Sequence, residues 1–403
     1  MSTATKLVRG VLSFAERLTS RFCYGAEAGI GGNVSRQTYW GFRLLAVAAL
    51  LAILVGCGGG SSTPSNPPPA AAPHFLFVAN STDRTVATYA IDGSTGTLTP
   101  RTSALTGGGR PLSIAVHPSG RFAYVTNSAD VSVFTIDSGT GTLAMVGTPV
   151  PTGPAPRAVA VDPTGHFLFI ASENQGTISS FQIDQTSGAL TLIGTVVCQD
   201  TIPFSMAVDP SGRFLLVANL GTTEVTAYSI NTATGALTLQ GGAPTGGQGL
   251  TSVAIDRRGQ FAYAVNLDSN DISIFRLTDI NTGQLVLGLL GSRPSSGKGP
   301  LALSLHPSGR FAYVVNFGSA DISAFSVDAD TGALTPTGSP VATGVNPVSV
   351  TVDPSGHFVY VGNLGSDSIS VFAIDATTGA LTPVGTPVPA PGPISVLASG
   401  PAQ

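Results

Sequence analysis

The chain has 403 residues, of which 42% are hydrophobic and only 10% are charged, and it contains 50 glycines and 29 prolines. So many evenly spread breakers argue against long helices and indicate short strands joined by turns. The net charge is −4 and Lys298 is the only lysine after Lys6, so there is no basic patch and we expect no nucleic-acid partner.

The first predicted element is a secretory signal. Residues 44–55 form the long apolar run of the sequence, with Arg36 and Arg43 before it and a small residue and Cys57 after it. This order of basic, apolar and small residues is typical of a cleavable signal, and the run is too short to span a bilayer comfortably. We expect residues 1–56 to be removed, cleavage falling just before Cys57.

Leu54-Val55-Gly56-Cys57 resembles the lipobox of bacterial lipoproteins, in which the cysteine is acylated and becomes the mature N-terminus. The glycine-, serine- and proline-rich residues 57–73 fit a tether. The resemblance implies a lipid-anchored protein of the cell envelope, on the periplasmic or outer-surface side, that meets the membrane only through its anchor. The alternative is an ordinary secreted protein with an incidental cysteine.

Two consequences concern the ends of this region. Residues 1–33 sit awkwardly ahead of the signal, so we expect translation to begin nearby, for example at Val34. Cys23 is removed with the signal and Cys57 carries the lipid, so Cys198 is then the only free cysteine of the processed chain. No intramolecular disulfide can form, and the fold depends on its own core.

A strand-like segment recurs seven times after the tether. Successive copies start 47, 45, 47, 47, 50 and 47 residues apart, a period typical of propeller blades, each a four-stranded antiparallel sheet. The copies are apolar at nearly every position, as expected for strands covered on both faces. They are FLFVAN (75–80), FAYVTN (122–127), FLFIAS (167–172), FLLVAN (214–219), FAYAVN (261–266), FAYVVN (311–316) and FVYVGN (358–363).

One repeat illustrates the predicted blade. Strand A is 113–116, strand B 122–127 and strand C 131–137, and strand D begins at Leu143. The A–B turn reads His/Asp-Pro-Ser/Thr-Gly, which suits a type I turn. The C–D turn reads D-x-x-T-G-x-L, and its glycine is expected at positive φ.

The ends of the chain predict how the ring closes. The first repeat lacks its strand A, whereas residues 393–398 (PISVLA) match residues 111–116 (PLSIAV), which contain strand A of the next repeat. The C-terminal strand should therefore pair with residues 75–80 and remove the open edges of the sheet. We expect an all-β, seven-bladed β-propeller over residues 74–403.

Tyr124-Val125-Thr126-Asn127 carries the signature of YVTN-type repeats. Together with the pattern A-V-x-P-S-G-R-F-x-Y-V-x-N and the D-x-x-T-G-x-L turn, it resembles the seven-bladed lactonase family, which includes 6-phosphogluconolactonase-like propellers. The resemblance implies a lactone hydrolase, a carboxylic ester hydrolase, that uses Arg, His and Glu at the channel mouth without a metal or other cofactor. None of those residues belongs to the repeat motif, so none is transferred by it.

Candidate site residues come from the loops that vary between repeats, B–C and D–A, which share one face of a propeller. The processed chain has two glutamates, Glu173 and Glu224, both expected in B–C loops. Arg110, Arg157 and Lys298 are expected in D–A loops just before strand A.

Lactone opening needs a base to activate water and a donor to hold the oxyanion. We assign Glu173 as the base and Arg157 as the oxyanion donor, with Lys298 as a third catalytic candidate. Arg110, Asp200 and Glu224 are expected to bind the ligand, a small lactone or carbohydrate-like molecule. The competing interpretation makes all of these solvated loop charges.

Other chemistry has weaker support. Cys198 has no evident histidine partner, and His117 and His306 take a turn position that aspartate fills in other repeats. The asparagine that ends six of the seven repeats fits strand-end architecture better than a cation site, and we expect no metal. The second possible function is a non-catalytic surface propeller that binds a ligand or a cell-envelope protein. We expect a monomer.

Overall fold

The computed structural model describes residues 74–198, 202–220, 222–280, 284–291 and 293–399. The predicted signal region 1–56, Cys57, the tether and Asp200 lie outside these residues. The chain divides into two units, Met1–Ala70 and Ala71–Gln403, and all the described residues belong to the second. No helix among the described residues is long and apolar enough to cross a membrane.

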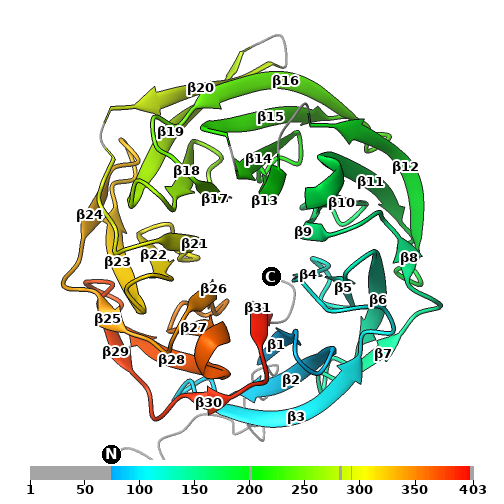
Figure 1. Ribbon diagram of the computed structural model, residues 1–403, viewed down its shortest axis with the longest axis horizontal. Helices are drawn as coiled ribbons and strands as arrows, with labels where there is room; N and C mark the ends of the chain where they lie inside the picture. The colour runs from blue at the N-terminus through cyan, green and yellow to red at the C-terminus, as the bar shows by residue number, and fades with distance from the viewer. Residues whose placement is uncertain (1–73, 199–201, 221, 281–283, 292, 400–403) are drawn as a thin grey trace, which may run out of the picture. The chain divides into compact units, whose positions relative to one another are not determined.

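Seven antiparallel sheets surround a central axis, and the strands of each sheet follow one another from the centre to the rim (Figure 1). The first four blades, each listed from its innermost strand, are β31 (Pro393–Ser399), β1 (His74–Asn80), β2 (Thr85–Ile91) and β3 (Leu98–Leu105); β4 (Ser113–Val116), β5 (Phe122–Thr126), β6 (Asp130–Ile136), β7 (Leu143–Met145) and β8 (Val150–Pro151); β9 (Pro156–Val161), β10 (Phe167–Ser172), β11 (Thr177–Ile183) and β12 (Leu190–Val197); and β13 (Ile202–Val208), β14 (Phe214–Leu220), β15 (Glu224–Ile230) and β16 (Leu237–Pro244).

Blades 5 to 7 repeat this order. They are β17 (Leu250–Ile255), β18 (Phe261–Asn266), β19 (Asp271–Ile280) and β20 (Gln284–Leu290); β21 (Pro300–Leu305), β22 (Phe311–Asn316), β23 (Asp321–Val327), β24 (Leu334–Pro336) and β25 (Val341–Ala342); and β26 (Pro347–Val352), β27 (Phe358–Asn363), β28 (Ser368–Ile374), β29 (Leu381–Pro383) and β30 (Val388–Pro389). The predicted seven-bladed propeller is confirmed.

Ring closure also follows the prediction. β31 pairs antiparallel with β1, from Phe75 opposite Ser399 to Asn80 opposite Pro393. The last strand of the chain thus supplies the innermost strand of the first blade, and Val396 within it is buried.

The core consists of seven apolar clusters, and each cluster joins one pair of neighbouring blades. The C–D turns help to seal these seams. Gly188 has a φ of 76°, and a Cβ there would lie 2.6 Å from the ring of Phe122 in the preceding blade. Glycine is required at this position for both reasons.

The A–B turns explain the histidines and aspartates that alternate there. Asp162 accepts the backbone N–H groups of Thr164 (3.0 Å) and Phe167 (2.7 Å). In blade 2, His117 Nδ1 accepts the backbone N–H of Ser119 (3.1 Å), and its Nε2 bonds to the carbonyl oxygen of Gly165 (2.9 Å) in the next blade. These histidines are turn residues, as predicted.

Candidate active site

Six blades begin with an irregular residue in the innermost strand. In β9, Pro156 pairs with Ser172 and Ala158 pairs with Ala171, so Arg157 falls between two rungs of the ladder. Such a bulge re-aims the extra side chain. The same position is skipped in β13, β17, β21, β26 and β31. We call these residues the collar and include the corresponding Leu112: Leu112, Arg157, Phe204, Thr251, Leu301, Val348 and Ile394.

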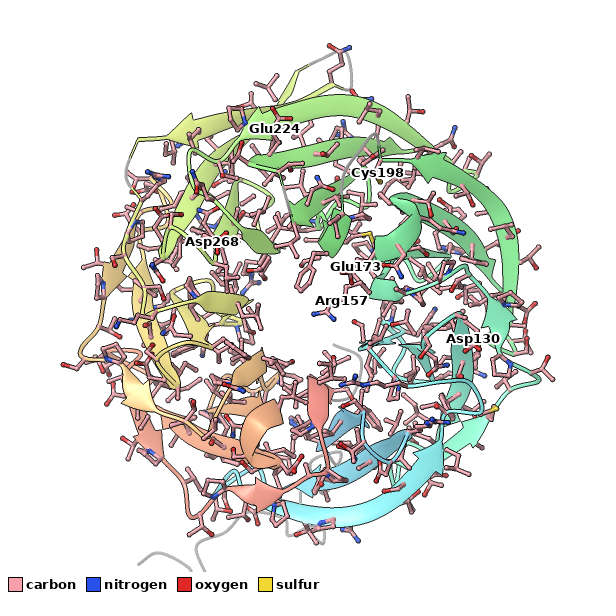
Figure 2. The ribbon with its side chains drawn as sticks, viewed as in Figure 1. Asp130, Arg157, Glu173, Cys198, Glu224 and Asp268 are labelled. Carbon is pink, nitrogen blue, oxygen red and sulfur yellow. The ribbon has the colours of Figure 1, made fainter. Side chains whose placement is uncertain are left out.

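Arg157 is the one charged member of the collar, and its side chain points toward the ring centre (Figure 2). Its guanidinium carbon lies 4.1 Å from the ring centroid of Phe204, the collar residue of the next blade. This is a cation–π contact between two partly buried side chains. Sequence reasoning placed Arg157 in a loop and missed Phe204. The structure places Arg157 within β9, as the second residue of that strand.

Three charged side chains influence one another here. Burial lowers the pKa of the Arg157 guanidinium, the negative charge of Glu173 opposes that shift, and the positive charge of Arg110 adds to it. Arginine starts from so high a pKa that it stays protonated at neutral pH. A cation with few surrounding waters interacts strongly with any charge that develops beside it.

Glu173 is half-buried and opens the 3-10 turn η1 (Glu173–Gln175), directly after β10. Its backbone N–H donates to the carbonyl oxygen of Ala155 (2.8 Å), in the loop that leads to Arg157. The hydroxyl of Ser172 donates to the carbonyl oxygen of Thr152 (3.1 Å) and joins the same two loops. Blade 3 therefore holds the backbones of the base candidate and the oxyanion-donor candidate in one hydrogen-bonded unit.

Glu173 and Arg157 do not form a salt bridge. A salt bridge does join Arg293 and Asp271 (3.5 Å), elsewhere in the ring, in blade 5. The carboxylate of Glu173 and the guanidinium of Arg157 are therefore not paired with each other, and both can form hydrogen bonds to a ligand.

Arg110 is exposed and lies before β4, at the seam of blades 1 and 2. Its Nη2 donates to the Ser81 hydroxyl (3.2 Å), which donates in turn to the carbonyl oxygen of Gly392 (2.9 Å). Arg110 thus has two effects: it is hydrogen-bonded through Ser81 to the chain near the ring closure, and its charge lowers the pKa of Arg157.

Two other candidates lie apart from this group. Lys298 is exposed and precedes β21, which lies across the ring from β9 (Figure 1). Glu224 is not a loop residue as expected but the first residue of β15, a third strand from the axis. It is exposed and lies outward from Arg157 (Figure 2). Glu173 and Arg110 act electrostatically on Arg157, whereas Lys298 and Glu224 do not belong to this group.

Cys198 is buried behind the site. The Tyr228 hydroxyl lies 3.4 Å from its sulfur, and burial raises the pKa of the thiol while that hydrogen bond opposes the shift. A raised pKa keeps the sulfur protonated, which is unfavourable for a nucleophile. Asp200, the remaining candidate, lies outside the described residues.

The asparagines at the ends of the B strands have a structural role. Asn127 Nδ2 donates to the side chains of Asp130 (2.6 Å) and Ser132 (2.8 Å), and Asn316 Nδ2 donates to Asp321 (2.6 Å) and Ser323 (2.9 Å). Each amide ties strand B to strand C of its own blade. Among the described side chains, no group of three or more His, Cys, Asp and Glu is placed to hold a metal ion.

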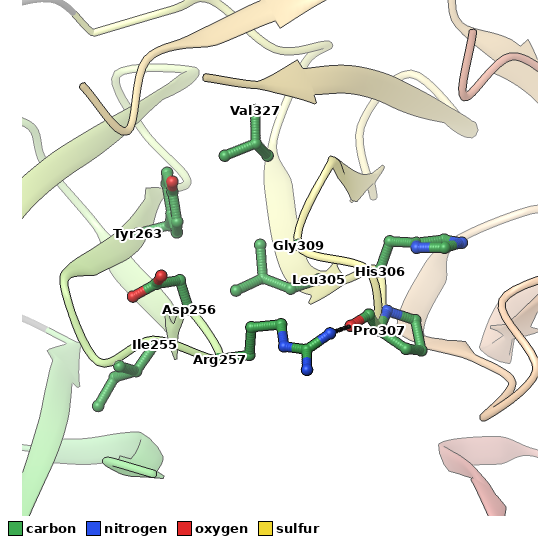
Figure 3. Close-up of a pocket in the computed structure, with 9 residues that line it drawn as sticks. All are labelled: Ile255, Asp256, Arg257, Tyr263, Leu305, His306, Pro307, Gly309 and Val327. Carbon is green, nitrogen blue, oxygen red and sulfur yellow. Dashed lines mark hydrogen bonds between the residues drawn. The ribbon is translucent and has the colours of Figure 1, made fainter. Parts of the chain in front are cut away.

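A cavity of about 220 Å³ lies on the opposite face, between blades 5 and 6 (Figure 3). Its polar groups are engaged in turns. Asp256 accepts the backbone N–H of Phe261 (2.7 Å), Arg257 donates to the carbonyl oxygen of Pro307 (3.0 Å), and His306 bonds to Gly356 (2.8 Å). We interpret this cavity as a seam between blades.

Comparison with known proteins agrees with this fold and names a family. The sequence matches the seven-bladed β-propeller lactonases in four overlapping segments, 70–154, 113–205, 204–288 and 288–398. These segments span the whole ring, so the chain belongs to the seven-bladed β-propeller lactonase family. No curated protein sequence matches it.

Solved structures share the fold at low sequence identity. A protein of Bacteroides fragilis, provisionally assigned as a 6-phosphogluconolactonase, has a TM-score of 0.73 and 23% identity over 83% of this chain and 100% of its own. The periplasmic gluconolactonase of Pseudomonas aeruginosa has a TM-score of 0.71 and 22% identity over 81% and 99%. A protein of Lactobacillus plantarum has a TM-score of 0.69 and 24% identity over 81% and 99%.

Proposed function

We propose that this protein hydrolyses a lactone at the collar, with blade 3 supplying the reacting groups. One observation carries the proposal. The single charged collar residue, Arg157, lies within electrostatic reach of the half-buried Glu173 of the same blade. Membership of the lactonase family supports the reaction class.

In the proposed reaction, the Glu173 carboxylate takes a proton from water while the water oxygen attacks the lactone carbonyl carbon. The Arg157 guanidinium donates hydrogen bonds to the carbonyl oxygen as negative charge develops on it. The bond between the carbonyl carbon and the ring oxygen then breaks. Glu173 returns the proton to that oxygen, and the product is the open hydroxy acid.

We also propose that Cys57 carries a lipid and that the propeller works outside the cytoplasm. The basic, apolar and small-residue order before Cys57 supports the signal, and residues 57–73 fit a tether. A fold relative, the gluconolactonase of Pseudomonas aeruginosa, is described as periplasmic. An exported enzyme does not meet phosphorylated sugar lactones of the cytosol, so we propose that its substrate is an unphosphorylated lactone.

A panel of sugar and aliphatic lactones assayed by acid release tests the proposal. Glu173→Gln keeps the size of the side chain and removes the base, so we expect kcat to fall by about 10²- to 10⁴-fold. Arg157→Gln removes the oxyanion donor and should cost about 10²- to 10³-fold. The matched control is Asp268→Asn, an exposed carboxylate on another B–C loop, which should keep wild-type rates.

Two results would overturn the proposal. Equal activity in the wild type and in Glu173→Gln would remove blade 3 as the site. Absence of hydrolysis across the panel by folded wild-type protein would favour a non-catalytic binding propeller instead.

A further inference from the structure

The residue directly after the end of strand B holds the same position in every blade. In five blades its backbone N–H donates to the carbonyl oxygen of the residue just before strand A, at 2.8 or 2.9 Å. These hydrogen bonds join Ser81 to Gly392, Glu173 to Ala155, Leu267 to Gly249, Phe317 to Gly299 and Leu364 to Asn346. The other two blades place Ser128 against Arg110 and Leu220 opposite Ile202. The proposed base, Glu173, therefore has an equivalent residue in each of the other six blades.

We call these seven residues the B-end ring, and its chemistry divides the ring into two parts. The members are polar in blades 1 to 3 and large and apolar in blades 4 to 7. The polar members are Ser81, Ser128 and Glu173, and the apolar members, which we call the apolar arc, are Leu220, Leu267, Phe317 and Leu364. Because consecutive blades are neighbours around the axis (Figure 1), the apolar arc lies on one continuous side of the ring.

The local backbone is alike in the two parts. Leu364 opens the 3-10 turn η2 (Leu364–Ser366) directly after β27, just as Glu173 opens η1 directly after β10. Leu267 also reaches blade 6, since a Cβ on Gly299 would lie 3.7 Å from its Cδ1. The carbonyl oxygen of Gly299 accepts the backbone N–H of Phe317, so two members of the apolar arc meet at one loop.

The side chains of the apolar arc do not belong to the core. Leu220, Leu267 and Leu364 are half-buried, and Phe317 is 38% exposed. Among the described residues that form the seven apolar clusters between blades, none of these four is present. Their apolar surface is therefore available to a ligand at the site.

The collar continues this apolar surface. Leu301 and Val348, the collar residues of blades 6 and 7, are half-buried and also lie outside the clusters. The hydroxyl of Thr251, in blade 5, donates to the backbone carbonyl oxygen of Val265 (3.4 Å). Asp268 and Lys298 are charged loop residues of blades 5 and 6, but both are exposed to solvent and neither belongs to the collar or to the B-end ring.

We propose that the substrate is a lactone with an apolar substituent, an alkyl or acyl chain, in place of the carbohydrate-like molecule expected from the sequence. The inference rests on the proposed function: the lactone carbonyl meets Arg157, and the chain lies against the apolar arc. The hydroxyl groups of a sugar lactone would lose water there without gaining hydrogen-bond partners. Each methylene of an apolar chain that is fully buried should instead strengthen binding up to about fourfold.

A series of γ-lactones that differ only in chain length tests the inference, from γ-butyrolactone through γ-hexalactone and γ-octalactone to γ-decalactone. We expect kcat/KM to rise along the series, and glucono-δ-lactone to be a poorer substrate than γ-decalactone. Equal kcat/KM along the series, or a preference for glucono-δ-lactone, would overturn the inference and leave lactone hydrolysis at blade 3 standing.

Substitution of the apolar arc should reduce this selectivity. Leu267→Asn keeps the approximate size of the side chain and should lower the ratio of kcat/KM for γ-decalactone to that for γ-butyrolactone about tenfold. Phe317→Ser serves if Leu267→Asn does not fold. Leu105→Asn is the matched control, because Leu105 is 71% exposed on the outer strand β3, and it should keep the wild-type ratio. An unchanged ratio in folded Leu267→Asn and Phe317→Ser would overturn the role of the apolar arc.

Binding separates this inference from the proposed hydrolysis. Calorimetry on Glu173→Gln should show tighter binding of γ-decalactone than of γ-butyrolactone, and adding Leu267→Asn should raise the dissociation constant of γ-decalactone about tenfold. Such binding without turnover by the wild type would support the apolar arc and remove the hydrolase. Equal binding of the two lactones would overturn the inference whether or not the wild type hydrolyses them.

Discussion

Asp92 shows how a single side chain holds a C–D turn. Its Oδ1 accepts the hydroxyl of Ser94 (2.6 Å) and the backbone N–H groups of Ser94 and Thr95 (both 2.9 Å). These hydrogen bonds, that of the Ser94 hydroxyl foremost, lower the pKa of Asp92 from 3.8 to about 2. The pKa values of the corresponding aspartates, Asp137, Asp184, Asp328 and Asp375, are lowered in the same way.

The lowered pKa predicts a pH dependence. Because the folded state favours the ionised form, the contribution of Asp92 to stability is complete above about pH 4 and is lost as the pH falls through about 2. Asparagine keeps the acceptor without the titration, as Asn231 does in blade 4 by accepting the N–H groups of Ala233 and Thr234. We expect Asp92→Asn to lose less stability than the wild type between pH 4 and pH 2, measured by thermal melts. If the melting temperatures of the wild type and of Asp92→Asn fell by the same amount between pH 4 and pH 2, this explanation would be contradicted.

The buried tyrosines of strand B offer a matched pair. The Tyr124 hydroxyl donates to the carbonyl oxygen of Gly188 (3.2 Å), whereas the equally buried Tyr263 hydroxyl has no partner. Tyr124→Phe should therefore lower the free energy of unfolding by about 1 kcal/mol, and Tyr263→Phe should be neutral or stabilising. Urea unfolding measures both, and equal losses would refute the distinction.

At the scale of the element, repeated turn chemistry made the fold predictable. The A–B and C–D turns recur with the same residue types, so they marked the ends of strands and gave the blade count. The unmatched strand at each end of the sequence gave the closure. Strand bounds differed by about one residue: strand C of blade 2, for example, begins at Asp130 and not at residue 131.

The site was less predictable because it depends on an irregularity of the strand. A bulge has no residue signature here: Arg157, Phe204 and Thr251 occupy equivalent positions with unrelated side chains. Only alignment of the seven repeats by their turns shows that one arginine interrupts an otherwise uncharged column. Glu224 was misplaced because β15 begins at this residue, which puts it in the third strand, away from the axis.

Deleting residues 393–403 removes β31 and leaves the inner edge of β1 unpaired. Ile394, Val396 and Leu397 of β31 contribute to the clusters on both sides of blade 1. We expect the whole domain to melt at a much lower temperature, because both seams weaken together. Deletion of residues 400–403 alone, which spares β31, should melt like the full chain. A truncation at 393 that melts normally would contradict closure by this strand.

At the scale of the molecule, the seven clusters make every blade dependent on two neighbours. No blade has a core of its own, so the ring should unfold as one cooperative unit although its sequence is repetitive. The low charge of the chain is consistent with this design, since the ring is held by apolar seams and by hydrogen bonds within turns.

The proposed anchor gives a prediction for the protein in the cell. In a bacterial host, Cys57→Ala should prevent acylation and move the protein from the membrane fraction to the soluble fraction. Radiolabelled palmitate should enter the wild type and not the variant. Cys198→Ala is the control and should keep the label, and a Cys57→Ala variant that stays in the membrane fraction would rule out the lipid anchor.

The pairing of β31 with β1 also determines when the ring can be completed. Among the described strands, β1, β2 and β3 leave the ribosome first, yet their inner partner β31 follows all the others in the sequence. The nascent chain therefore holds an open edge while the other blades are synthesised, and closure must wait until β31 has left the ribosome. A ring that closes this late also fits the export that we propose, because secretion through a translocon requires an unfolded chain.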